Sequence, residues 1–283
     1  MVSDEWLETI NKEFRRQDIN PKRRPWLAIQ EYSKQFGCSI AFSSPLAQKI
    51  FKWFEDNSQP GVHSIGSLFT GVFYFDACFW PVSIPMGYGT YALNALDSLE
   101  SMPEKLKEEL MSDRHQAWDY VLFWADCVDY GYGFDDLSKT EKMDTFGRKL
   151  LNSGNAELNA AISQLCEFRP NSKSMMSSRM AVEMFLKALI AIKEGLSEGE
   201  AKKLGHKLDA AIDRCISLTN DEMLKAVRKD LGIYPSIDER YSGKESPYQD
   251  LWKAYAVAQC IATAVIRTFT DRDIRPQVLS GAS

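Results

Sequence analysis

The chain has 283 residues, of which 45 % are hydrophobic and 26 % charged, proportions typical of a globular protein. Its formal charge is −5 and its sequence pI about 5.4, which excludes a whole-molecule basic field of the kind that attracts nucleic acid. A chain of this length can form one large domain or two ordinary ones, and it can bury a sizeable core without disulfides.

Residues 1–14 are polar and acidic, without the apolar core of a signal peptide. No run of about 18 uncharged apolar residues occurs, so we expect no membrane span. The six cysteines do not approach a CxxC spacing, and three of them follow apolar residues of predicted helices. We therefore expect a cytoplasmic protein with reduced, buried thiols at Cys166, Cys215 and Cys260.

The first 140 residues contain apolar positions at helical spacing in three early segments. These predict helices over residues 4–16, 26–36 and 44–55. Residues 64–91 are instead rich in Phe, Tyr, Trp and Val, with glycines and prolines between them, which favours a small sheet or hairpin packed on helices. Pro81 and Pro85 argue against a regular central strand.

Residues 93–110 and 113–129 predict two further helices, and we expect residues 129–140 to form the loop that ends this region. The glycine-rich stretches GYGTY (87–91) and GYGF (131–134) lack the complete patterns of phosphate-binding loops. We therefore interpret both stretches as turns.

The pattern from about residue 141 is regularly helical, with apolar stripes at steps of three and four. Four amphipathic helices with short connections predict an antiparallel bundle. The expected fold is thus mainly α. It comprises a mostly helical region with a few short strands over 1–140, a bundle over 141–272 and a tail over 273–283.

Three patterns in this C-terminal half resemble the HEPN family of helical domains, which occurs in many prokaryotic toxin, defence and nucleotidyltransferase-associated proteins. AVEMFLKALIAIKEGL (181–196) is similar to the family's second helix, and GHKLDAAI (205–212) to the start of its third. YPSIDERYSG (234–243) is similar to the Arg-Tyr turn before its final helix. The resemblance implies a helical bundle that pairs as a homodimer, in a defence or toxin–antitoxin setting.

One departure from the family's pattern concerns catalysis. Catalytic members carry an Arg followed four to six residues later by a His near the start of the final helix. None of the three histidines, His63, His115 and His206, has an arginine at that distance upstream. The departure argues against a metal-independent ribonuclease of the usual type.

A line of charged residues, Arg179, Glu183 and Lys187, recurs every four residues along the predicted second bundle helix. Two interpretations stay open. The line is the solvated face of a helix, where each opposite-charge pair stabilises by roughly 0.2–0.5 kcal/mol. Alternatively it faces a groove in which Lys187 and Arg240 hold an anion such as phosphate.

His206 has two interpretations as well: a helix cap or backbone hydrogen bond, or contact with a ligand and proton transfer. Arg240-Tyr241 either ties a loop to Glu183 or clamps a ligand. The candidate ligand-binding residues are therefore Glu183, Lys187, His206, Arg240 and Tyr241. No catalytic residue is identified, and no metal or cofactor is expected, because the histidines and acidic residues lack metal-site spacing.

Two functions follow from these observations. The first is a non-catalytic HEPN-like interaction protein that binds a nucleotide, a nucleic acid or a protein partner encoded nearby. The second is a ribonuclease with a dispersed site of Glu183, Lys187, His206 and Arg240. The missing Arg-to-His spacing favours the first. Apposition of Arg240 and His206 would favour the enzyme, and burial of His206 against a backbone partner would favour the interaction protein.

Overall fold

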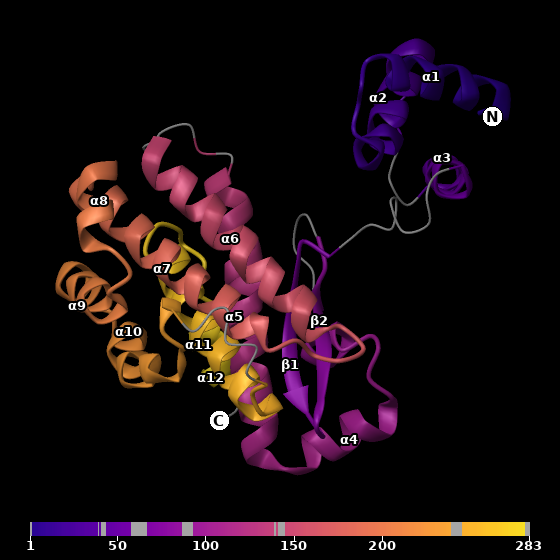
Figure 1. Cartoon of the computed structure of the whole chain (residues 1–283). Helices are drawn as coiled ribbons and strands as arrows, with labels where there is room; N and C mark the ends of the chain where they lie inside the picture. Colours follow the sequence, from indigo (N-terminus) through magenta and orange to yellow (C-terminus); the bar gives the residue numbers. More distant parts are fainter. Residues whose placement is uncertain are drawn as a thin grey trace. The chain divides into compact units, whose positions relative to one another are not determined.

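The computed structural model describes residues 2–38, 40, 44–57, 67–86, 93–138, 140, 145–238 and 245–280 (Figure 1). These residues form helices and one two-stranded sheet, so the expected mainly α fold with short strands is confirmed. The contacts divide the chain into two compact units, Met1–Gly66 and Ser67–Ser283. This division differs from the sequence-based boundary near residue 140. No helix in the described part of the chain has the length and hydropathy needed to cross a membrane.

The first unit contains three helices that surround a small apolar core. The helices are α1 (Asp4–Arg16), α2 (Arg24–Phe36) and α3 (Pro45–Asp56), preceded at α2 by the short 3-10 helix η1 (Pro21–Arg23). The Ser3 and Ser44 side chains cap α1 and α3 by accepting backbone N–H groups. The core side chains are buried or nearly so: Leu7, Phe14, Ile29, Ile50 and Phe54.

The second unit begins with the expected hairpin, β1 (Phe69–Phe75) and β2 (Cys78–Ile84), which are antiparallel. Asp76 and Ala77 form its two-residue turn with φ of 49° and 57°, the left-handed geometry that matches the twist of a hairpin. Pro81 lies opposite Val72, whose N–H donates instead to the Tyr255 hydroxyl at 3.3 Å. The missing N–H of Pro81 therefore costs the ladder nothing.

Helix α5 (Arg114–Ser138) corrects the expected loop over 129–140 and the expected turn at 131–134, because it runs as one helix through both glycines. A Cβ at Gly131 would lie 2.9 Å from Phe69 Cβ, and one at Gly133 would lie 2.3 Å from Ile266 Cγ2. The glycines therefore allow close packing on the hairpin and on a later helix rather than a turn. GYGTY (87–91) lies outside the described residues.

Between the hairpin and α5 lie the 3-10 helix η2 (Ala95–Ser98) and helix α4 (Glu104–Ser112). The remaining long helices pack side by side around α7 (Figure 1). They are α6 (Thr145–Leu165), α7 (Lys173–Glu194), α9 (Leu208–Thr219) and α11 (Tyr248–Arg267). Shorter elements connect or follow them: α8 (Glu198–Leu204), α10 (Glu222–Val227), η3 (Arg228–Ile233) and α12 (Arg275–Ser280). A single core runs from the hairpin through these helices.

Four charged residues form a buried network that joins α5 to α11 and to the C-terminal segment. Asp126 accepts two hydrogen bonds from Arg275, at 2.8 and 2.6 Å, and lies 3.0 Å from Arg267. Arg267 also pairs with Asp129, which in turn accepts the backbone N–H of Ile274. Burial raises the pKa of Asp129, and the Arg267 charge opposes that rise. The segment expected to be a tail over 273–283 is thus anchored through residue 275 and forms α12.

The contact between Gly133 and Ile266 generates a stability prediction. Gly133→Ala forces a methyl group into the packed α5–α11 crossing, and overpacking of this kind typically costs about 1–3 kcal/mol. Gly199→Ala, at a helical glycine of α8 with nothing within 4 Å, should leave stability equal or slightly higher. Urea unfolding of both variants checks this, and equal midpoints would contradict the close packing.

Candidate functional site

The charged line of α7 is buried, which corrects the interpretation of a solvated helix face. Arg179, Glu183 and Lys187 are 7 %, 1 % and 7 % exposed. Alternating polarity on a helix predicts only that one face is charged. Here that face is covered, because the segment leading into α9 lies against it and Arg179 donates to the His206 carbonyl at 2.8 Å.

Glu183 is the centre of this cluster. Its Oε1 accepts a hydrogen bond from Lys187 Nζ at 2.7 Å, and its Oε2 lies 2.8 Å from His206 Nδ1. Arg179 Nη1 is 3.6 Å from the same Oε2. Both carboxylate oxygens therefore have partners, as a charge removed from water requires.

His206 is the exposed member of the cluster, with 57 % of its side chain accessible. Its ring partner is the Glu183 carboxylate and not a backbone group, so the burial against a backbone partner that would favour the interaction protein is not found. Because Nδ1 is bonded to the carboxylate, Nε2 is the ring nitrogen that can bond to a ligand. A neutral ring then presents a proton acceptor there, and a protonated ring presents a donor.

The cluster carries more positive than negative charge. Arg179, Lys187 and Glu183 sum to +1, and protonation of His206 brings the sum to +2. Arg179 Nη1 is buried and makes no hydrogen bond among the described residues. Excess buried charge with an unused donor is suited to an anion.

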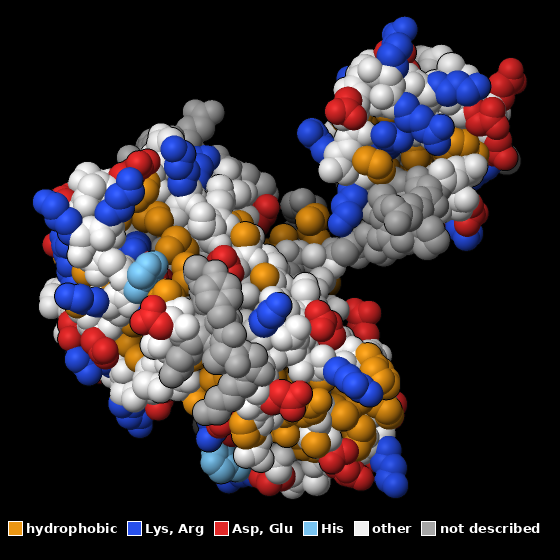
Figure 2. Space-filling view, viewed as in Figure 1, with side chains coloured by type: hydrophobic (Ala, Val, Ile, Leu, Met, Phe, Trp, Pro, Cys, Tyr) orange, Lys and Arg blue, Asp and Glu red, His pale blue; other side chains and the backbone are white. Residues whose placement is uncertain are grey.

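The surface next to His206 adds exposed lysines. Lys202, Lys203 and Lys207 flank it in sequence, and all three are exposed. Lys and Arg side chains are interspersed with acidic ones over α8 and α9 (Figure 2). Behind the cluster, burial raises the pKa of Tyr234 well above its usual value, and the Arg179 charge opposes that rise.

Of the five sequence-predicted ligand residues, the structure brings together Glu183, Lys187 and His206. Arg240 and Tyr241 lie outside the described residues, so the proposed tie between Arg240 and Glu183 stays a prediction. Arg179 belongs to the same cluster, and its spacing in the charged line was the signal for it.

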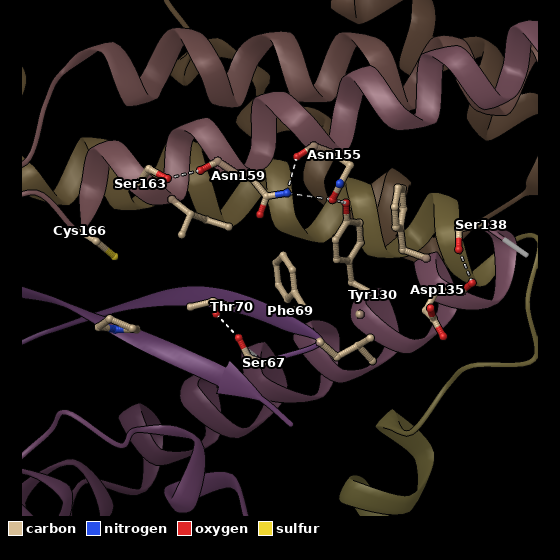
Figure 3. Close-up of a pocket in the computed structure, with 15 residues that line it drawn as sticks. Ser67, Phe69, Thr70, Tyr130, Asp135, Ser138, Asn155, Asn159, Ser163 and Cys166 are labelled. Carbon is tan, nitrogen blue, oxygen red and sulfur yellow. Dashed lines mark hydrogen bonds between the residues drawn. The ribbon is translucent and has the colours of Figure 1, made fainter. Parts of the chain in front are cut away.

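The sequence analysis missed a second feature, a cavity of about 680 Å³ between the hairpin and helices α5 and α6 (Figure 3). The α6 wall of this cavity is polar, with Asn155, Asn159 and Ser163 four residues apart. Their spacing is visible in the sequence, but an exposed polar stripe is also what any surface helix shows.

The cysteines follow the expectation in part. Cys215 is buried, with its thiol 3.4 Å from the Leu186 carbonyl, and Cys260 is half-buried. Burial raises the pKa of both thiols to about 12. Cys166 was expected to be buried and is exposed, because α6 ends at Leu165 and the residue lies at the rim of the cavity.

Comparison with known proteins identifies no relative of this chain: no family model, no curated protein and no solved structure matches it.

The Glu183 cluster generates a second stability prediction. Glu183→Gln leaves Lys187 and Arg179 buried without a counter-charge, and breaking a buried ion pair in this way costs about 3–5 kcal/mol. Glu194→Gln is the matched control, because Glu194 lies on the same helix and pairs with Arg214 at the surface. That control should cost less than about 1 kcal/mol. Urea unfolding measures both, and similar losses would contradict a special role for the buried carboxylate.

A third prediction concerns Cys166, because partial enclosure of its sulfur raises the pKa of this thiol to about 11. The reactive thiolate is then scarce at neutral pH, and iodoacetamide should modify Cys166 roughly tenfold or more slowly in the folded chain than in urea at pH 8. The folded-state rate should continue to rise toward pH 11. Peptide mapping by mass spectrometry gives both rates, and a plateau near pH 9 would show an ordinary thiol.

Proposed function

We propose that this protein is a HEPN-like binding protein without catalytic activity, and that it holds a phosphate-bearing ligand, a nucleotide or nucleic acid, at the His206 end of its bundle. The observation that carries the proposal is the excess positive charge of the Glu183 cluster beside a half-exposed imidazole. The sequence resemblance supports the same class, and the missing Arg-to-His spacing supports binding without cleavage.

The second ionic network of the molecule provides a contrast. In that network each arginine has a carboxylate partner of its own: Arg275 pairs with Asp126, and Arg267 pairs with Asp129 and also lies 3.6 Å from the exposed Asp273. The Glu183 cluster is not balanced in this way, and its Arg179 Nη1 has no hydrogen-bond acceptor among the described residues. An anion near His206 would lower the electrostatic cost of the unbalanced charge.

A ribonuclease is the second candidate, and one observation favours it. A carboxylate that holds Nδ1 orients the histidine and leaves Nε2 to accept a proton, the arrangement used by general bases. His206 would then take a proton from an RNA hydroxyl while the neighbouring cations hold the phosphate. No acid partner for the leaving group is placed by the described residues.

The test measures binding and cleavage of a fluorescent single-stranded RNA, with metal chelated. We expect wild type to bind without cleaving, and His206→Ala to bind roughly tenfold or more weakly, because one charge-assisted hydrogen bond is worth about 1.5–3 kcal/mol. His115→Ala is the matched control, since His115 is also exposed beside a carboxylate, at 3.6 Å from Asp119. It should bind as wild type does.

Three results separate the alternatives. Cleavage that His206→Ala abolishes and His115→Ala retains would establish the ribonuclease and overturn the binding protein. If both histidine variants weaken RNA binding equally, binding depends on general surface charge, and the proposed site at His206 is contradicted. The same samples are titrated with ATP, and folded protein that binds neither the RNA nor ATP would contradict a phosphate-binding site at His206. Light scattering on the same samples tests the expected homodimer.

A further inference from the structure

The cavity between the hairpin and α6 has the size of a small-molecule site, because about 680 Å³ lies within the usual range for such sites. Its walls differ in character. The hairpin side and α5 contribute apolar and aromatic side chains together with the polar Thr70, Asp135 and Ser138, and α6 contributes mainly amide and hydroxyl groups beside Ile162. The Asn155 side chain lies beside the Tyr130 ring, and the Asn159 side chain extends from α6 toward Phe69 (Figure 3).

The two asparagines have a defined hydrogen-bond inventory. Asn155 Oδ1 accepts from the Tyr130 hydroxyl at 2.8 Å and from Asn159 Nδ2 at 3.1 Å, which uses both of its lone pairs. Asn159 Nδ2 also donates to the Asn155 carbonyl at 2.8 Å, which fixes the orientation of that amide. Among the described residues, nothing bonds to Asn155 Nδ2 or to Asn159 Oδ1. The pair therefore offers one amide NH2 group as donor and one carbonyl oxygen as acceptor.

Aromatic rings line the cavity beside these amides. Phe69 meets Tyr130 edge to face, with centroids 4.8 Å apart, and Tyr130 stacks on Phe134 at 5.8 Å with an interplanar angle of 26°. Phe69, Tyr130 and Phe134 all line the cavity. Rings fixed by one another form a rigid apolar wall suited to a planar ligand.

The cavity contrasts with the His206 site in charge. Asp135 is the one charged residue among the described residues that line it, and no Lys or Arg is among them. A phosphate or carboxylate would lose its hydration there without gaining a cation. An uncharged ligand would pay no such cost.

From this combination we infer that the cavity binds a neutral planar molecule whose edge carries an N–H donor beside an acceptor. An amino-substituted nucleobase and a primary carboxamide share this chemistry. The ligand edge would pair with Asn155 Nδ2 and Asn159 Oδ1 while its ring lies against the aromatic wall. The site is separate from the His206 cluster and does not depend on the function proposed there.

The experiment titrates the full chain with adenosine, cytidine and nicotinamide and follows binding by calorimetry or ligand-observed NMR. We expect saturable binding of at least one of them, and binding about tenfold weaker to N6,N6-dimethyladenosine, which lacks the donor, if adenosine binds. Binding of nicotinamide but of neither nucleoside would show that the ligand is a carboxamide. Adenosine monophosphate should bind no better than adenosine, because the cavity has no cation.

The variants locate the site. Asn159→Leu removes the acceptor from an exposed position of α6 and should weaken binding about tenfold, and Ser163→Trp should block the cavity by bulk. Asn152→Leu, an exposed asparagine of α6 that does not line the cavity, is the matched control and should bind normally. His206→Ala should also bind these ligands normally, so a negative result for the cavity can be told apart from a negative result for the His206 site.

Two outcomes would overturn the inference. One is no saturable binding of any of the three ligands at millimolar concentration by folded protein. The other is binding that Asn159→Leu and Ser163→Trp leave unchanged, which would place the ligand elsewhere.

Discussion

A carboxylate removed from water must be paired, and the arrangement of the second unit's bundle depends on how Glu183 meets that requirement. One oxygen takes Lys187, one turn along the same helix, and the other takes His206 from the segment between α8 and α9. Arg179 adds a hydrogen bond to the His206 backbone. Two of these contacts, from Glu183 and Arg179 to His206, join α7 to the segment that leads into α9, and they hold the imidazole at the surface.

The same unit contains a second buried ionic network, in which each acidic residue pairs with an arginine. Asp126 and Asp129 lie in the middle of α5, where burial alone would make carboxylates costly, and Arg267 and Arg275 pair with them. This network holds the C-terminal segment against α5 and α11. A buried ion pair by itself says little about function. A buried charge in excess of its partners is the more informative sign of a ligand site.

The spacing of apolar residues was enough to predict the helical character of the chain and most helices of the bundle, and the enrichment of aromatic residues and valine over residues 64–91 predicted the small sheet or hairpin. The sequence pattern failed at Gly131 and Gly133, because glycine has the same sequence signature whether it allows a turn or a close helix crossing. Only the tertiary neighbours, Phe69 for Gly131 and Ile266 for Gly133, distinguish the two cases.

The sequence was enough to predict that Arg179, Glu183 and Lys187 share one side of a helix, but not that they are buried. A spacing of four places Arg179, Glu183 and Lys187 on one line, but which element covers that line depends on tertiary packing. The partner of His206 likewise comes from 23 residues earlier. For the cavity, Asn155 and Asn159 look like ordinary surface residues until Tyr130 and the hairpin are placed against them.

The hairpin strands are rich in aromatic residues, and their edges bear on whether the chain aggregates. A two-stranded sheet has two open edges, and each could recruit a strand from another molecule and start aggregation. On β1, the outward N–H of Val72 is already bonded to Tyr255. On β2, the residue opposite is Pro81, which has no N–H to offer. Each edge therefore lacks a free backbone N–H at its midpoint, which disfavours pairing of FTGVFYF with a strand of another molecule.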